Sequence, residues 1–168
     1  MKTMIVTLGC PGSGKTTKAL NFALTTRKGQ LGSIVRANRD ELRNTVLMNY
    51  FTGIGWHEDL ITTLQYEIIT DAFMNADEDR CVIIDDTNVN PRVLGRWFEE
   101  ATEYEADVIV LDCRGVPLET CLERNANRER RVPDNVIRQF HAGLEGKNAK
   151  IDQFRSHPRL REWIEMAD

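Results

Sequence analysis

The stretch that decides the fold lies near the start of the chain and reads MIVTLGCPGSGKTT, residues 4–17. Its first half is apolar and predicts a buried strand, and a helix is expected to begin near Lys15. Between them, the spacing G-x-x-x-x-G-K-T is that of a phosphate-binding loop, in which glycines let successive backbone N–H groups point at one anion. The residues predicted to bind the phosphates are Gly9, Pro11, Gly12, Ser13, Gly14, Lys15, Thr16 and Thr17.

Two of these residues have particular roles in such a loop. Lys15 can reach the β- and γ-phosphates of a nucleoside triphosphate, and the Thr16 hydroxyl can bind Mg²⁺. The helix that follows directs its positive end at the same anion. The sequence therefore predicts a site for ATP, or another nucleoside triphosphate, together with Mg²⁺. A glycine-rich turn with an incidental lysine is the competing interpretation.

The composition is that of an ordinary globular domain. The chain has 168 residues, of which 41% are hydrophobic and 29% charged, and its net charge is −4. This predicts one domain over residues 1–168 and argues against a protein that coats nucleic acid broadly. No apolar run is long enough to cross a membrane, and the short N-terminal apolar segment does not read as a signal peptide. The four cysteines lack C-x-x-C spacing and are interpreted as reduced thiols, so a cytoplasmic location is expected.

Outside the loop, strand and helix patterns alternate along the chain. Apolar runs predict further strands at 33–37, 81–85 and 107–112. Asn38 and Asn90 are predicted helix N-caps. Helices are predicted over 16–26 and 39–50, and a longer one after residue 56. Further helices are predicted to begin at Pro91, Pro117, Pro133 and Pro158. A turn is predicted at 28–32. The alternation predicts an α/β fold with a mostly parallel sheet of about four strands and a helical C-terminal end at about 146–168.

Acidic residues follow two of these strands, at the edge of the sheet where ligands of such folds bind. Asp40 could accept the proton of an attacking hydroxyl, or it could serve only as a favourable acid at a helix N-terminus. Asp85 and Asp86 end the third strand, where an acid usually contacts Mg²⁺ directly or through water. Asp85 is the metal candidate of this pair, in addition to Thr16 of the loop. The alternative is that the two acids only form a turn at the end of the strand.

Arginines gather in a segment that is predicted to form a helical lid at about 124–135. Arg124 and Arg128 are four residues apart, so they share one face of a helix. Arginines in such a lid could close over the phosphates and stabilise the charge that develops there. The alternative is a solvated basic end of a helix, which the helix dipole also favours.

Four segments together resemble the 5′-kinase domain of bacteriophage polynucleotide kinases, namely GCPGSGKT (9–16), NRDELR (38–43), DTNVNP (86–91) and RNANR (124–128). The resemblance covers about residues 4–145 and implies a three-layer αβα P-loop kinase. It implies transfer of phosphate from ATP or another nucleoside triphosphate to a 5′-hydroxyl end of DNA or RNA, as in nucleic acid repair. On this resemblance Lys15 binds the donor phosphates, Asp40 is the general base, and Arg128 is the lid arginine, with Arg124 in support.

The same resemblance implies a set of acceptor contacts. Arg43 would bind the phosphate next to the reacting nucleoside, and Arg39 is a second contact of this kind. The floor of the cleft between donor and acceptor would be shaped by Asp86, Thr87 and Asn88. The D-x-D pair of the 3′-phosphatase domain that such enzymes often carry is absent, so only the kinase half of the family is expected, in the host cytoplasm if a phage encodes it.

Two other functions stay open at this point. A small-molecule kinase of the same fold, acting on a nucleoside, sugar or antibiotic hydroxyl, would keep Lys15, Thr16, Asp40 and Arg128. Arg43 discriminates against it, because a phosphate clamp is useless for an acceptor without phosphate. The second alternative is a non-catalytic module that binds nucleoside triphosphates, and the intact base and lid arginines argue against it.

Overall fold

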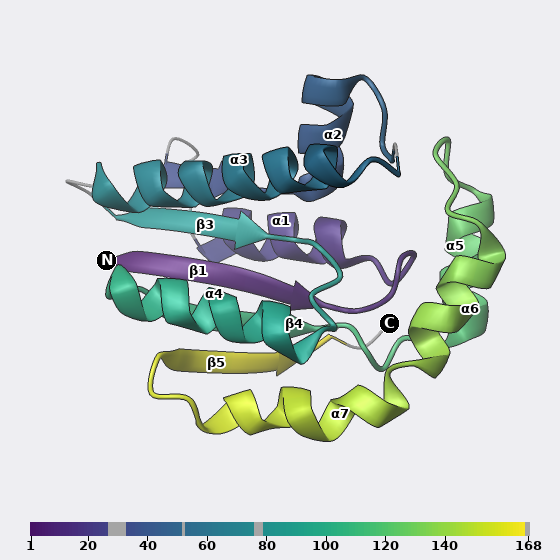
Figure 1. The fold of residues 1–168 in the computed structure, drawn as a ribbon. Coiled ribbons are helices and arrows are strands. Elements are labelled where there is room, and N and C mark those ends of the chain that lie inside the picture. Colours follow the sequence, from purple (N-terminus) through teal and green to yellow (C-terminus); the bar gives the residue numbers. More distant parts are fainter. Residues whose placement is uncertain (27–32, 52, 76–78, 167–168) are drawn as a thin grey trace.

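The computed structural model describes residues 1–26, 33–51, 53–75 and 79–166 (Figure 1). Its centre is one sheet in the order β2-β3-β1-β4-β5, in which every neighbouring pair of strands is parallel. The predicted turn at 28–32 lies outside the described residues. The strands are β1 (Lys2–Leu8), β2 (Ile34–Arg36), β3 (Arg80–Ile84), β4 (Asp107–Asp112) and β5 (Leu160–Glu165).

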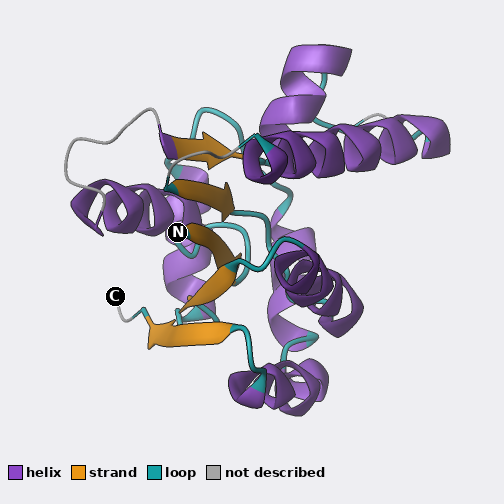
Figure 2. Cartoon of the chain, turned by 90° about the vertical axis from the view of Figure 1, so that its left-hand side faces the viewer, coloured by secondary structure: helices purple, strands orange, loops and turns teal. Residues whose placement is uncertain are grey.

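Helices cover both faces of this sheet, as Figure 2 shows in a view along its edge. They are α1 (Lys15–Thr26), α2 (Arg39–Leu47), α3 (Gly55–Met74), α4 (Pro91–Glu103), α5 (Leu118–Ala126), α6 (Asp134–Ala142) and α7 (Glu145–Asp152). A short 3₁₀ helix, Gln153–Ser156, follows α7. The predicted three-layer αβα fold is therefore confirmed.

Alternate residues of the inner strands enter two separate hydrophobic clusters. Ile5 of β1 packs with Ala19 and Ala23 of α1 on one face of the sheet. Val6 belongs to the larger cluster on the other face, which includes Phe73 of α3 and further side chains of α4. Because both faces are covered, the inner strands are apolar along nearly their whole length. The packing fixes the carboxyl ends of β1, β2 and β3 side by side, where the loop and the acidic residues follow.

The predicted caps set two helix starts that matter for the site. The Asn38 side chain accepts a hydrogen bond from the Glu41 amide at 2.9 Å and starts α2. The Asn90 side chain accepts one from the Arg92 amide at 3.0 Å, with Pro91 in the first turn of α4. Helix α2 ends at Leu47 rather than at residue 50, because the next residue, Met48, adopts a left-handed conformation with φ of 50°.

The predicted helical C-terminal end is wrong in its second half. After α7 and the 3₁₀ helix, the chain turns at Pro158 and adds strand β5 parallel to β4, so the sheet has five strands rather than about four. The indole of Trp163 donates to the Asp112 carboxylate at 3.0 Å, and Ile164 packs on the smaller cluster. The edge of β4 is thereby paired, which a short helix at this place could not achieve.

Two further sequence expectations bear on the class of protein. All four cysteines are buried and none forms a disulfide, as predicted. Among the helices that the structure describes, none combines the length and the apolar character that crossing a bilayer requires.

Candidate active site

The phosphate-binding loop joins the end of β1 to the start of α1 and is held by backbone hydrogen bonds, one within the loop and one to the segment after β3. The Ser13 amide donates to the Cys10 carbonyl, and the Gly9 amide donates to the Thr87 carbonyl after β3. Gly12 and Gly14 have φ of 87° and 82°, a region that favours glycine. At Gly12 a Cβ atom would lie 2.3 Å from the Cys121 carbonyl oxygen of α5, so a larger residue would displace the lid helix from the loop.

The loop fits a bound triphosphate. The Lys15 side chain is only 8% exposed and its Nζ donates to the Cys10 carbonyl at 2.8 Å. Burial lowers the pKa of Lys15, and the charge of Arg128 acts in the same direction. The buried Ser13 hydroxyl has no hydrogen-bond partner among the described residues. A polyanion would satisfy this hydroxyl and neutralise the two cations, which is the chemistry expected of a donor-phosphate site.

Cys10 in the middle of the loop takes no part in this chemistry as a thiolate. Burial raises its pKa to about 11, and the neighbouring Cys121 adds to the shift, so the thiol stays protonated at neutral pH.

The two acidic residues after β3 are both engaged by protein donors. Asp85 is 2% exposed and both of its carboxylate oxygens accept from Arg36, at 3.0 and 2.7 Å. One Asp86 oxygen accepts from the Arg39 amide at 3.0 Å and the other from Gln65 Nε2 at 2.6 Å. Burial raises the pKa of Asp86. The described residues contain no cluster of three or more potential metal ligands, so contact of Asp85 with Mg²⁺ stays a prediction.

The next two residues anchor the floor of the cleft. The Thr87 carbonyl holds the phosphate-binding loop, while its side chain lines an open groove. Asn88 has φ of 48°, its amide donates to the Thr7 and Ile84 carbonyls, and its Oδ1 accepts from Trp97 Nε1 at 2.9 Å. The Asn88 side chain thus shapes the floor through bonds within the protein, and direct contact with an acceptor stays a prediction.

Asp40, the predicted base, lies in the first turn of α2 with a side chain that is 46% exposed. One carboxylate oxygen accepts from Arg43 at 2.9 Å and the other from Arg130 at 2.8 Å. Arg130 also lies over the ring of Tyr50, 3.7 Å from its centroid. The structure therefore brings the predicted base, the predicted acceptor arginine and the lid segment together. Arg130 lies in the predicted lid, and the sequence left its role open.

Glu58 in the first turn of α3 fixes both predicted acceptor arginines. It accepts from Arg43 Nε and Nη2 at 2.8 and 2.5 Å, and from Arg39 Nη2 at 2.9 Å. The hydrogen bonds from Arg43, aided by Arg39, lower the pKa of Glu58 to about 2. Sequence reasoning missed this residue, because its only local signal is that of any acid at a helix N-terminus.

The lid consists of the end of α5, the turn after it and the start of α6, and it stands at the carboxyl ends of the strands (Figure 1). Arg124 Nη1 lies 3.6 Å from the place of a Cβ on Gly14, directly beside the loop. Asn125 bonds both backbone groups of Val132, the amide at 2.9 Å and the carbonyl at 2.7 Å, and so fixes the turn that carries Arg128. Arg124 therefore lies beside the loop, and the charge of Arg128 acts on Lys15. Contact of either arginine with the donor phosphates stays a prediction.

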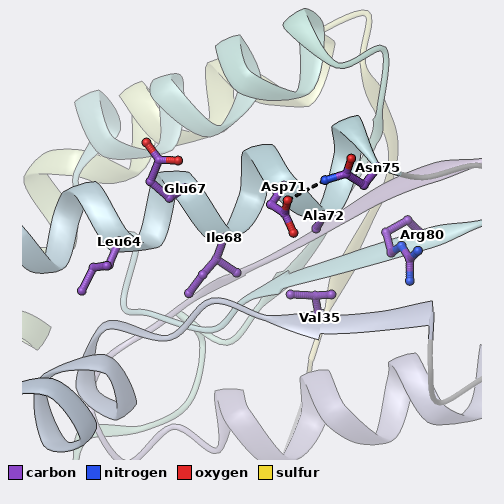
Figure 3. Close-up of a pocket in the computed structure, with 8 residues that line it drawn as sticks. All are labelled: Val35, Leu64, Glu67, Ile68, Asp71, Ala72, Asn75 and Arg80. Carbon is purple, nitrogen blue, oxygen red and sulfur yellow. Dashed lines mark hydrogen bonds between the residues drawn. The ribbon is translucent and has the colours of Figure 1, made fainter.

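One hollow of the described surface lies away from this site. It has a volume of about 560 Å³ and is lined by α3 and the edge strand β2, with Ile68, Asp71 and Arg80 among its walls (Figure 3). Arg80 begins β3, so this hollow lies toward the amino ends of the strands and contains no residue of the loop. It is therefore no part of the candidate active site.

The fold and the loop define a domain of the P-loop kinase superfamily. The chain belongs to the family described as an AAA domain, whose model matches residues 4–146. That match contains the loop, Asp40, the acidic residues after β3 and the lid. Members of this kind bind nucleoside triphosphates, usually with Mg²⁺.

Solved structures share the fold. A chain of the Pnkp1/Rnl/Hen1 RNA repair complex matches with a TM-score of 0.70 and 24% identity, over 89% of this chain and 46% of that one. A second structure of the Pnkp1/Rnl/Hen1 complex matches at 0.59 with 27% identity, over 79% and 41%. A chain of the AvrRxo1-ORF1:AvrRxo1-ORF2 complex with sulphate ions matches at 0.67 with 16% identity, over 96% and 54%. The present chain thus spans about half the length, or less, of each of these three chains.

Proposed function

We propose that this chain is a polynucleotide 5′-hydroxyl kinase, which transfers the γ-phosphate of ATP or another nucleoside triphosphate to a 5′-hydroxyl end of DNA or RNA. The observation that carries the proposal is the Asp40 carboxylate with Arg43 bonded to it. Asp40 and Arg43 lie three residues apart on one helix. This arrangement suits an acceptor nucleoside that carries a phosphate near its reacting hydroxyl, because the base can face the hydroxyl while the arginine binds the phosphate. Similarity to chains of an RNA repair complex supports a nucleic acid acceptor.

In the proposed reaction the 5′-oxygen attacks the γ-phosphorus and the bond from that phosphorus to the β,γ-bridging oxygen breaks. The hydroxyl proton passes to an Asp40 oxygen, and the nucleoside diphosphate leaves. Arg130 occupies one of those oxygens, so it moves aside or shares the carboxylate when the acceptor arrives. Asp40 therefore acts as the base, and Arg43 orients both it and the acceptor.

The donor side works by positioning and charge neutralisation. Backbone amides of the loop and Lys15 would bind the phosphates, and Arg124 and Arg128 would close over them from the lid. Thr16 would bind Mg²⁺ together with oxygens of the nucleotide, and Asp85 would act on the metal from the end of β3. When bound, the ion would supply positive charge that offsets the negative charge developing on the transferred phosphate.

The experiment that tests the proposal is transfer of labelled γ-phosphate to a panel of acceptors. The panel contains 5′-hydroxyl DNA and RNA oligonucleotides, nucleoside 3′-monophosphates and plain nucleosides. We expect transfer to every acceptor with a phosphate next to the reacting nucleoside, and far lower kcat/KM for plain nucleosides. Equal kcat/KM for nucleosides and their 3′-monophosphates would indicate a small-molecule kinase instead, and hydrolysis or binding of ATP without transfer to any acceptor would contradict a kinase.

A further inference from the structure

A second groove opens directly beside the acceptor side of the site. Its volume is about 470 Å³, within the size range of small-ligand sites. It begins at Asp86 and Thr87 after β3 and continues between α3 and α4 toward α6 and α7. Neither the donor site nor the Asp40 cluster accounts for its far end.

The far end of this groove carries positive charge. Arg96 of α4 and Lys147 of α7 line it, and among the described residues neither has an ion-pair partner. The acid in its wall is Asp86, at the near end, where the Arg39 amide and Gln65 already bond it. On a protein with a net charge of −4, two cations left without acidic partners at one end of a groove favour an anionic ligand.

Aromatic side chains form the walls between the two ends. Trp97 is 3% exposed, donates to Asn88 and packs against Tyr66 with ring centroids 5.3 Å apart, so this wall is held rigidly. The half-buried rings of Tyr66 and Phe140 line the groove. Aromatic faces next to cations are the combination on which nucleobases stack while their phosphates are bound.

We infer that this groove binds the acceptor strand beyond its first nucleotide. Arg96 and Lys147 bind the backbone phosphate that follows the one assigned to Arg43, and Tyr66 and Phe140 contact a nucleobase. The inference rests on the proposed polynucleotide kinase function and extends it. It predicts a higher kcat/KM for acceptors with two or more phosphate linkages than for a nucleoside 3′-monophosphate.

The test compares two acceptors in variants of the full chain. Arg96→Ala, Lys147→Ala and the double variant are assayed with a nucleoside 3′-monophosphate and with a 5′-hydroxyl trinucleotide. Matched controls are Arg92→Ala, on the same helix but outside the groove, and Lys150→Ala, three residues further along α7. Thermal unfolding of each variant checks that the fold is intact.

We expect each groove variant to lower kcat/KM for the trinucleotide about tenfold, as for loss of one charge-assisted phosphate contact. The value for the nucleoside 3′-monophosphate, and both values in the control variants, should stay near those of the wild type. The salt dependence of trinucleotide phosphorylation should also become shallower, because fewer counterions are exchanged.

The outcomes separate the inference from the proposed function. If the wild type phosphorylates neither acceptor, the proposed function fails and the inference falls with it. If the wild type phosphorylates both, but the groove variants lose nothing on the trinucleotide or lose equally on both acceptors, the kinase stands and the groove assignment is wrong.

Discussion

Asp40 bonds one arginine of its own helix, Arg43, and one from the distant lid, Arg130, and its role as a base can be tested by a single substitution. In Asp40→Asn, one side-chain oxygen still accepts from Arg43 or Arg130, but the group no longer accepts a proton. We expect kcat to fall about 10²-fold or more, with little change in the affinity for ATP. Steady-state kinetics with an oligonucleotide acceptor measure the first quantity and equilibrium binding of ATP the second. A variant with the kcat of the wild type would leave Asp40 as a helix-end acid.

Arg43 offers a second test at the scale of one residue. Its guanidinium bonds Asp40 and both oxygens of Glu58, an arrangement that lysine cannot reproduce. We expect Arg43→Lys to lower kcat/KM for oligonucleotides and nucleoside 3′-monophosphates, and Arg43→Ala to lower it more, by about 10–100-fold.

The decisive quantity for Arg43 is the ratio of kcat/KM between phosphate-bearing and phosphate-free acceptors. Loss of a phosphate contact lowers this ratio, because plain nucleosides have no phosphate to bind. Distortion of the α2–α3 corner lowers both values together and leaves the ratio unchanged. An unchanged ratio would therefore assign Arg43 to the fold and remove the strongest residue-level support for a polynucleotide acceptor.

At the scale of elements, the Glu58 carboxylate ties α2 to α3 and should make the stability of the protein depend on pH. Hydrogen bonds from Arg43 lower the pKa of Glu58 from 4.5 to about 2. A depressed carboxyl pKa stabilises the folded state above the unfolded-state value, and this stabilisation is lost as pH falls through the folded-state value. We expect the difference in free energy of unfolding between wild type and Glu58→Gln to narrow as pH falls from about 4.5 to about 2.

Denaturant unfolding at a series of pH values measures this difference. The matched control is Asp59→Asn, which removes the neighbouring, exposed acid and leaves the arginines bound. The difference in free energy of unfolding between the wild type and Asp59→Asn should not narrow comparably over the same pH range. If the Glu58→Gln difference stays constant over the same range, the ion pairs do not couple the helices in solution.

The same two helices show what the sequence could and could not predict. The N-cap at Asn38 was predictable because its partner, Glu41, lies three residues away and the signal is local. Asp85 bonds Arg36, which lies 49 residues away, and Asp40 bonds Arg130, which lies 90 residues away, besides the local Arg43. No local pattern specifies such pairs, since they depend on which strand ends and loops the packing brings together.

At the scale of the whole molecule, the inner strands of the sheet could be predicted from the sequence, whereas the edge strand β5 could not. The strands β1, β3 and β4 are covered on both faces and read as apolar runs, whereas the segment L-R-E-W-I-E of β5 does not. An edge strand has only one neighbour, and here its side chains are half-buried or exposed. Its strand character comes from pairing with β4 and from contacts with the 3₁₀ helix Gln153–Ser156, whose Arg155 bonds Glu165 and lies against Trp163. These are tertiary features.

Trp163 should be the residue through which this edge stabilises the molecule. Its ring packs on the larger cluster, its indole donates to Asp112, and the Arg155 guanidinium lies 4.4 Å from the ring centroid. Because the side chain is only half-buried, we expect Trp163→Ala to cost about 2 kcal/mol, below the roughly 3–5 kcal/mol of a fully buried tryptophan. For a chain of this length that loss lowers Tm by about 4–8 °C.

Trp56 provides the matched control, because its side chain is 63% exposed and contacts the ring of His57 at the start of α3. Trp56→Ala should change Tm little, although both variants lose the same chemical group. Trp163→Phe keeps an aromatic ring on the cluster but loses the donor to Asp112, so its Tm should lie between those of the wild type and Trp163→Ala. Thermal unfolding followed by circular dichroism measures all three. Equal Tm values for Trp163→Ala and Trp56→Ala would mean that β5 contributes nothing to global stability, and that the inner strands and their helices suffice for the fold.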